Sequence, residues 1–223
     1  HNENHIDLDR THFHHGSASL SLSSEPSSGQ VSKAAIQKEG LDLREGQVVY
    51  MSASFYIPSG SSIENVFLWD LECGNCWSQT NAQPNKSPGI RLGLFNSQGY
   101  PTVERGKIGY RTGNFKQNVN QPVFIPRDKW VQLAWIVHLA ANEGGLTEVF
   151  LDGTKIISEY GVNMPQPEYF MKHFGVHLNT PVHYDRIQVG ITANGSRNPV
   201  KIYVDDVELR LLEEPNPPPH VPQ

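Results

Sequence analysis

The sequence lacks any apolar run of the roughly 18 residues that a membrane-spanning helix needs, so we expect no insertion into a membrane. Charge is scarce as well. Charged residues make up 18% of the 223 residues, and 18 basic side chains against 23 acidic ones leave a formal net charge of -5. A protein that reads a nucleic-acid backbone needs a basic stripe, so this balance argues against nucleic acid as a partner.

Only two cysteines are present, Cys73 and Cys76, in the order Cys-Gly-Asn-Cys. A zinc site of this type would need a second ligand pair, and the sequence has no further cysteines. A redox pair would need a βαβ context, which the strand-like residues 68–72 do not supply. We expect a small disulfide that pins a loop, which favours an oxidising compartment and predicts a secreted protein.

Turn-forming residues, in contrast, are abundant. The 19 glycines and 16 prolines disfavour long helices and favour many short strands joined by turns. Apolar and polar side chains alternate as they do in strands over residues 15–22, 48–57, 66–72, 89–95, 106–111, 130–139, 147–157, 174–178, 186–191 and 200–211.

This pattern predicts a single all-β domain, an antiparallel β-sandwich over residues 16–212. Residues 130–139 support it, because one face of that strand is wholly apolar while the other is mixed. Residues 1–15 are expected to form an N-terminal arm. Residues 213–223 are a proline-rich tail, which cannot enter a sheet and would suit a tether to further domains.

Four segments resemble a known fold. Residues 129–135, Lys-Trp-Val-Gln-Leu-Ala-Trp, and residues 145–153, which end in Leu-Asp-Gly, are similar to a hairpin of concanavalin A-like and laminin-G-like jelly rolls. Residues 16–20 and 200–209 are similar to the first and last strands of such domains. The resemblance implies a jelly roll. Because glycan binding, glycoside hydrolysis and polysaccharide elimination all occur on this scaffold, function has to be argued from the site.

The first candidate site is the pair Asp70 and Glu72. In a strand they project from one face, about 6–7 Å apart, the separation that retaining glycosidases use. The segment is similar to the Glu-x-Asp-x-Glu strand of laminarinase-like glycoside hydrolases, but Leu68 stands where that family has its nucleophile. We therefore expect the pair to be solvated or to hold the loop around Cys73, and it could also bind sugar hydroxyls.

The second candidate site is residues 168–177, which resemble a stretched version of the Tyr-Phe-Lys-x-Gly-x-Tyr strand of alginate and glucuronan lyases. The resemblance implies that Lys172 faces a uronate carboxylate and that His177 stands in the place of the second Tyr, as acid or base. Tyr169 and Arg111 would complete the catalytic set. Other strand residues that would line such a cleft are Arg91, Tyr110 and His138. In the alternative interpretation the apolar residues of this stretch are core and the polar ones face water.

The third candidate site would bind a metal ion. Asp205 and Asp206, together with Asp7 or Asp9, resemble the calcium-pinned edges of carbohydrate-binding jelly rolls, although calcium wants several oxygen ligands. The opening of the chain is also rich in histidine, with His1, His5, His12, His14 and His15. His12 and His14 share one side of an extended chain and would suit a transition metal. The alternative is a flexible polar arm.

Tryptophan can stack on the apolar face of a sugar ring. Trp69, Trp77, Trp130 and Trp135 are the candidates. Trp135 lies on the apolar strand face and is expected in the core, whereas Trp77 follows the cysteine loop and is expected to face a ligand.

Our first hypothesis is an extracellular domain that binds a polysaccharide in a concave cleft. The alternatives are a lyase that cleaves a uronate polymer by β-elimination and a structural or adhesive laminin-G-like domain.

Overall fold

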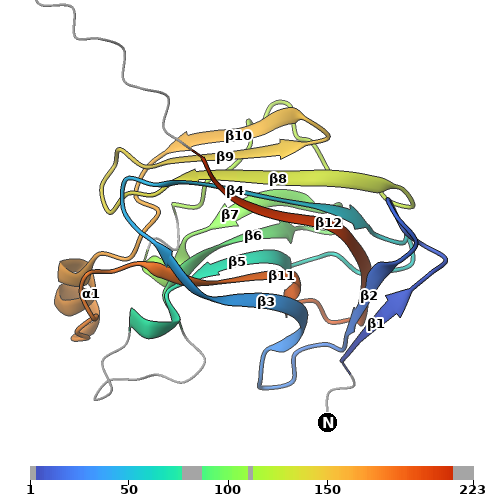
Figure 1. Ribbon diagram of the computed structural model, residues 1–223, viewed down its shortest axis with the longest axis horizontal. Helices are drawn as coiled ribbons and strands as arrows, with labels where there is room; N and C mark the ends of the chain where they lie inside the picture. The colour runs from blue at the N-terminus through green and yellow to red at the C-terminus, as the bar shows by residue number, and fades with distance from the viewer. Residues whose placement is uncertain (1–3, 77–86, 110–112, 213–223) are drawn as a thin grey trace, which may run out of the picture.

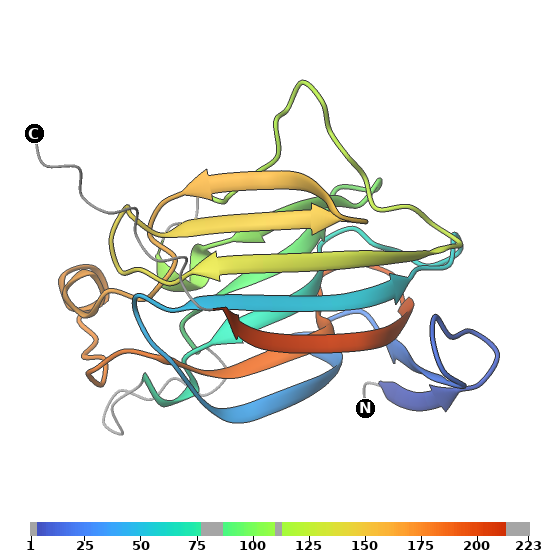
Figure 2. The ribbon, with the colours of Figure 1, turned by 45° about the horizontal axis from the view of Figure 1, so that its top comes forward.

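The computed structural model describes residues 4–76, 87–109 and 113–212. Within these residues the chain folds into two antiparallel sheets, shown as two layers in Figures 1 and 2. The strands are β1 (His5–Asp9), β2 (Ser19–Ser24), β3 (Ser32–Leu43), β4 (Val48–Tyr56), β5 (Val66–Glu72), β6 (Gly89–Phe95), β7 (Tyr100–Glu104), β8 (Trp130–His138), β9 (Leu146–Leu151), β10 (Thr154–Tyr160), β11 (Tyr184–Asn194) and β12 (Val200–Leu212). The helical elements are α1 (Pro167–Phe174) and the 3₁₀ turns η1 (Gly74–Cys76) and η2 (Gly106–Ile108).

The predicted all-β sandwich is confirmed. A seven-stranded sheet has the order β1-β2-β12-β4-β8-β9-β10, and a five-stranded sheet has the order β3-β11-β5-β6-β7. Neighbouring strands in both sheets run antiparallel. The last strand, β12, lies between β2 and β4, so the beginning and the end of the sandwich domain share one sheet.

The core lies between the two sheets. Val131, Leu133 and Trp135 on β8 are at most 2% exposed, as are Met51 and Phe55 on β4. The apolar face predicted for residues 130–139 is thus confirmed, and Trp135 is a core residue. Because side chains alternate along a strand, the residues between these positions point away from the core. The outer faces of the two sheets therefore lie on opposite sides of the molecule.

The strand predicted over residues 174–178 is wrong. Helix α1 ends at Phe174, and residues 175–177 are not part of a strand. Pro167 occupies the first turn, where its missing N–H costs nothing. Glu168 follows at the positive end, while Lys172 and His173 lie in the last turn. Gly175 ends the helix with a φ of 63°, a conformation that favours glycine. These residues favour a helix over residues 167–174, and the glycine turn that ends it prevents the next residues from starting a strand at residue 174.

Two further expectations differ from the structure. Residues 106–111 were expected as a strand, but Gly106–Ile108 form η2, which ends at Gly109 with a φ of 99°. Residues 5–9, expected within a flexible arm, form β1 and pair with β2 along their whole length. Ile6 and Leu8 are 44% and 60% exposed, so backbone hydrogen bonds rather than burial hold this edge strand.

Strands β3 and β7 had no clear sequence signal. Lys38 and Glu39 interrupt the alternation of β3, and Pro101 lies within β7. Proline is tolerated there because β7 is the edge of the five-stranded sheet. Among the described residues, no helix is long and apolar enough to cross a membrane.

Candidate functional site

A row of polar side chains crosses the outer face of the five-stranded sheet. In the strand register its members are Gln37 of β3, Gln188 of β11, Asp70 of β5, Arg91 of β6 and Glu104 of β7. The two ends of the row are tied by hydrogen bonds. Gln188 donates to Gln37 at 3.0 Å, and Arg91 Nε donates to Glu104 at 2.8 Å. Five strands thus contribute one polar group each to a row that crosses the whole sheet.

Two carboxylates at the centre of this face are buried. Asp70 is 1% exposed and Glu72 is 2% exposed. Lys107 of η2 reaches back over β5 and donates to both of them, with a distance of 3.2 Å to Asp70 Oδ2. Arg186 of β11 donates from Nε and Nη2 to Glu72 at 3.0 and 2.7 Å. Thr192 donates to the other oxygen of Asp70 at 3.0 Å. The expectation that this pair is solvated is wrong.

The charges around Glu72 determine its protonation state. Burial alone would raise the pKa of Glu72, but Lys107, Arg186 and Lys33 outweigh burial, so the pKa lies below its usual value. A glycosidase acid needs a raised pKa so that it can give up a proton at neutral pH. Glu72 is an ionised acceptor of hydrogen bonds instead, which argues against a hydrolase that uses this pair.

Arg91 is held in place from two sides. Its guanidinium pairs with Glu104 and lies 3.7 Å above the centre of the Phe67 ring. The Phe67 ring lies where a side chain of residue 93 would be, since a Cβ added to Gly93 would come within 2.7 Å of it. Phe67 also contacts Phe95 edge to face, with ring centroids 5.5 Å apart. Arg91 is therefore a preorganised cation that lies next to the Phe67 and Phe95 rings, and its side chain is 18% exposed.

A cavity of about 430 Å³ continues the same face beyond Arg91. Its floor is formed by the outward side chains of β6 and β7, and the segment after β7 forms its wall. The lining residues are Phe95, Asn96, Tyr100, Thr102, Asn114, Lys116, Val119, Pro122 and Phe124. A pocket with aromatic rings, amides and one lysine can hold a sugar ring by its apolar face and its polar edge.

The family model for polysaccharide lyases matches residues 6–208. This chain belongs to the polysaccharide lyase family. Comparison with curated protein sequences gave no significant match.

Solved structures share the fold of this chain. An endo-beta-1,4-glucuronan lyase from the fungus Trichoderma reesei has a TM-score of 0.64 and 12% identity, over 93% of this chain and 87% of that one. The Cellulose induced protein, Cip1, has a TM-score of 0.60 and 15% identity, over 93% and 85%. The alginate lyase Aly36B has a TM-score of 0.53 and 12% identity, over 89% and 84%. At these identities the likeness shows the fold alone.

Three of the predicted catalytic residues lie on or after α1 rather than on a strand. Lys172 and His177 are exposed, and neither belongs to the polar network around Asp70. Tyr169 packs on Gly109, where an added Cβ would come within 2.3 Å of its ring, and its hydroxyl donates to the Gly109 carbonyl at 3.3 Å. Tyr169 thus braces η2, the turn that carries Lys107.

The other residues predicted to contact a sugar do not lie together on one face of the described structure. Trp77, Tyr110 and Arg111 lie outside the described residues, so their roles stay predictions. His138 lies on the outer face of the seven-stranded sheet, because its neighbour Val137 is in the core. It cannot share a cleft with Arg91. Of the other candidate platforms, Trp69 is 1% exposed and buried in the core.

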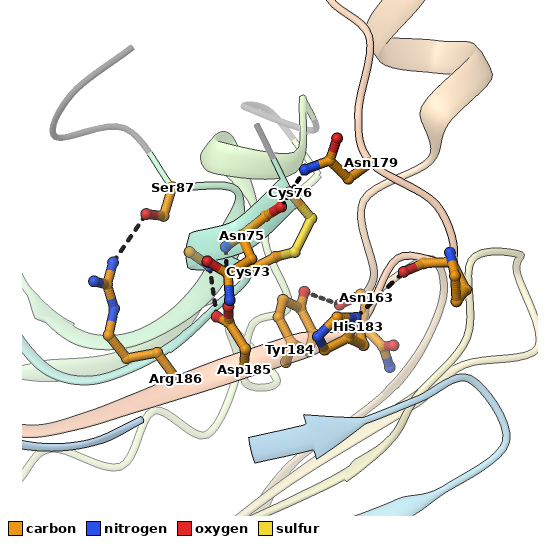
Figure 3. The surroundings of a disulfide bond; sticks show 12 residues. Cys73, Asn75, Cys76, Ser87, Asn163, Asn179, His183, Tyr184, Asp185 and Arg186 are labelled. Atoms are coloured by element: carbon orange, nitrogen blue, oxygen red, sulfur yellow. Dashed lines mark hydrogen bonds between the residues drawn. A yellow bond between two sulfur atoms is a disulfide. The ribbon is translucent and has the colours of Figure 1, made fainter. Parts of the chain in front are cut away.

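The predicted disulfide is present between Cys73 and Cys76. It closes η1 at the end of β5, next to the polar network. Asp185 accepts the backbone N–H groups of Gly74 and Asn75 at 2.6 and 2.9 Å, while its neighbour Arg186 reaches Ser87, as Figure 3 shows. The disulfide and the alternating residues of β11 therefore fix the same end of the candidate site.

The predicted calcium ligand Asp205 accepts hydrogen bonds from backbone N–H groups. Asp205 Oδ2 accepts the backbone N–H groups of His14 and His15 at 2.9 and 3.1 Å, and its Oδ1 accepts that of Asp206. Asp7 lies on β1, which β2 separates from β12. The described residues thus offer no cage of several oxygen atoms around Asp205 and Asp7, and the calcium site stays a prediction.

Sequence reasoning missed Lys107, Arg186, Gln188 and Thr192. The alternation of Arg186 and Gln188 with Ile187 and Val189 predicts a strand with two polar side chains on one face, and that signal was available. Lys107 had no such signal, because only the 3₁₀ turn and its contact with α1 direct it over β5.

Proposed function

We propose that this polysaccharide lyase cleaves a uronate-containing polymer by β-elimination, over the outer face of the five-stranded sheet. The observation that carries the proposal is that four cations, Lys33, Arg91, Lys107 and Arg186, lie on that face of a protein whose net charge is -5. Three of them pair with carboxylates of the same face, whereas Lys33 has a neutral amide as its partner. The neighbouring cavity supports it, since a polymer needs room for sugars beside the one that reacts.

β-Elimination makes clear demands on the site. A base removes the proton from C5 of the uronate, the bond from C4 to the glycosidic oxygen breaks, a C4=C5 double bond forms, and the leaving oxygen takes up a proton. A cation near the carboxylate stabilises the negative charge that develops in the transition state. Arg91 suits this role because Glu104 and Phe67 hold it rigidly beside the cavity.

Lys33 is the candidate base. It extends from β3 and donates to Gln188 Oε1 at 3.1 Å, so its partner is a neutral amide rather than a carboxylate. The residue is exposed as a whole, but partial desolvation of its amino group lowers the pKa of Lys33, and the charges of Asp70 and Glu72 oppose this effect. A lowered pKa increases the fraction of neutral amine, which is the form that accepts a proton.

We also propose that the chain acts outside the cell. A disulfide persists in oxidising compartments. A polymer substrate is too large to be imported intact, so it has to be cleaved outside the cell. Both points support secretion.

The test of the proposed function is to incubate the chain with glucuronan, alginate and neutral glucans and to follow ultraviolet absorbance. We expect absorbance to rise with at least one uronate polymer and to stay flat with the neutral ones, because only a uronate yields the C4=C5 product. A flat trace with every uronate polymer, combined with retention of the chain on a polymer-containing affinity gel, would overturn catalysis in favour of a binding domain.

Lys33→Met is expected to reduce the rate of this reaction by about 10²-fold or more, the range of general base catalysis. Lys38→Met is the matched control, because Lys38 lies on the same strand and pairs in register with the inward-facing Ile187 rather than with Gln188. Equal rates for the two variants would remove Lys33 from the mechanism.

A further inference from the structure

Three potential metal ligands converge on the outer face of the seven-stranded sheet, on the opposite side from the proposed catalytic face. The Nδ1 atoms of His14 and His15 lie 2.6 and 2.8 Å from Asp206 Oδ2. Ser54 of β4 donates to the same oxygen at 3.0 Å. The ligand atoms of the two histidines and the aspartate all lie within 4.8 Å of one another. No other carboxylate oxygen described in the chain has two imidazoles against it.

The backbone holds these side chains in position. Asp205 accepts the N–H groups of both His14 and His15, which fixes two consecutive residues beside β12. Asp206 has a φ of 51° within a β-bulge, and this re-aims its carboxylate toward the two rings. The His14 ring lies 5.7 Å from that of Trp130. The cluster is therefore built from segments about 190 residues apart in sequence.

We propose that His14, His15 and Asp206 form a binding site for one divalent transition cation of the zinc class. Two imidazoles and one carboxylate are a common ligand set for Zn²⁺, with water in the fourth position. At metal–ligand distances near 2.1 Å, two ligand atoms of a tetrahedral site lie about 3.4 Å apart. The two N–O separations of 2.6 and 2.8 Å would need to open by about 0.6–0.8 Å, which rotations of the three side chains can supply.

The ligands also match the accessibility and the chemistry that such an ion requires. The side chains of His14, His15 and Asp206 are 36%, 72% and 30% exposed, so an ion can enter from solvent. Imidazole nitrogen suits zinc, copper and nickel, whereas calcium and magnesium prefer a shell made of oxygen alone. A bound ion would join residues 14–15 to β12 and so hold the N-terminal segment on the sandwich.

Zinc titrated into the chelator-treated chain is expected to bind in a one-to-one ratio by isothermal titration calorimetry. It is also expected to raise the Tm, by about 5 °C or more at a hundred times the dissociation constant. Calcium present in the same titration should leave the zinc isotherm unchanged, because calcium prefers a shell of oxygen ligands and should not compete for this site. Cobalt(II) in place of zinc should give the visible absorption bands of a tetrahedral site, which report the ligand geometry directly.

His15→Ala is the main variant, since it removes an exposed side chain and should not disturb folding. We expect it to weaken zinc binding at least about tenfold. His183→Ala is the matched control, because His183 is a half-buried histidine elsewhere in the fold, and this variant should retain the wild-type affinity. Zinc affinity that is equal in all three proteins would overturn the proposal and assign binding to other histidines, and so would the absence of saturable binding to the wild type.

Discussion

Lys107→Met is expected to lower the free energy of unfolding by about 3 kcal/mol, the lower end of the range for breaking a buried ion pair. The substitution leaves Asp70 without its cation and leaves Glu72 with Arg186 alone. Both carboxylates are buried, so the lost partner cannot be replaced by water without rearrangement. Urea unfolding measures the change. Lys201→Met is the control, because Lys201 is exposed on the other sheet, and we expect a change within about 0.5 kcal/mol.

The pH dependence of the same variant tests the cause. The pKa of Glu72 is lowered in the folded chain, so its ionised form stabilises the fold fully above the pKa of an unfolded glutamate, about 4.3. This contribution is lost as pH falls through the lower, folded pKa. The stability difference between wild type and Lys107→Met should therefore be full at neutral pH and shrink in acid. A difference that stays constant down to acid pH would contradict the ion-pair explanation.

A second substitution separates charge from packing. In the Lys107→Met background, Asp70→Asn removes the carboxylate charge that is left without a cation and should restore part of the lost stability. No recovery would indicate that the stem of Lys107, rather than its charge, stabilises this face.

Arg91→Met is expected to lower kcat on the preferred uronate polymer by about 10²–10³-fold, the effect of losing one preorganised charge-stabilising group. Arg91 touches the reacting sugar in the proposed function, and its guanidinium stabilises charge that appears in the transition state, so kcat should fall more than KM rises. Steady-state kinetics measures both. Arg210→Met is the matched control, since Arg210 pairs with Glu208 on the opposite sheet.

Arg91→Lys refines this prediction. Lysine keeps the charge but loses the planar guanidinium that stacks on Phe67 and pairs with Glu104, so it should restore only a small part of the rate. A rate for Arg91→Met within about twofold of wild type would remove Arg91 from the active site, whatever the result for Lys33.

The strands that make the core were predictable because their periodicity is local. In β8 and β4 each inward residue is apolar over eight or more positions, and that pattern is typical of strands regardless of the rest of the fold. Helix α1 shows the limit of the same reasoning. Its stretch resembles a strand motif of alginate and glucuronan lyases, while the proline and glycine at its two ends indicate a helix.

Local sequence patterns are enough to predict the all-β class, the apolar faces of the core strands, the adjacency of Asp70 and Glu72 on one face of β5, and the spacing that allows the Cys73–Cys76 disulfide. All of these depend on residues within a few positions of one another. In contrast, the contacts of the two carboxylates with their cations, and of Asp206 with its two histidines, arise from the folded arrangement of distant segments. Lys107 lies 35 residues from Glu72 and His14 lies 192 residues from Asp206. Such meetings depend on strand order and on turns far away in the chain, because burial and charge pairing are properties of the assembled sheets rather than of any segment.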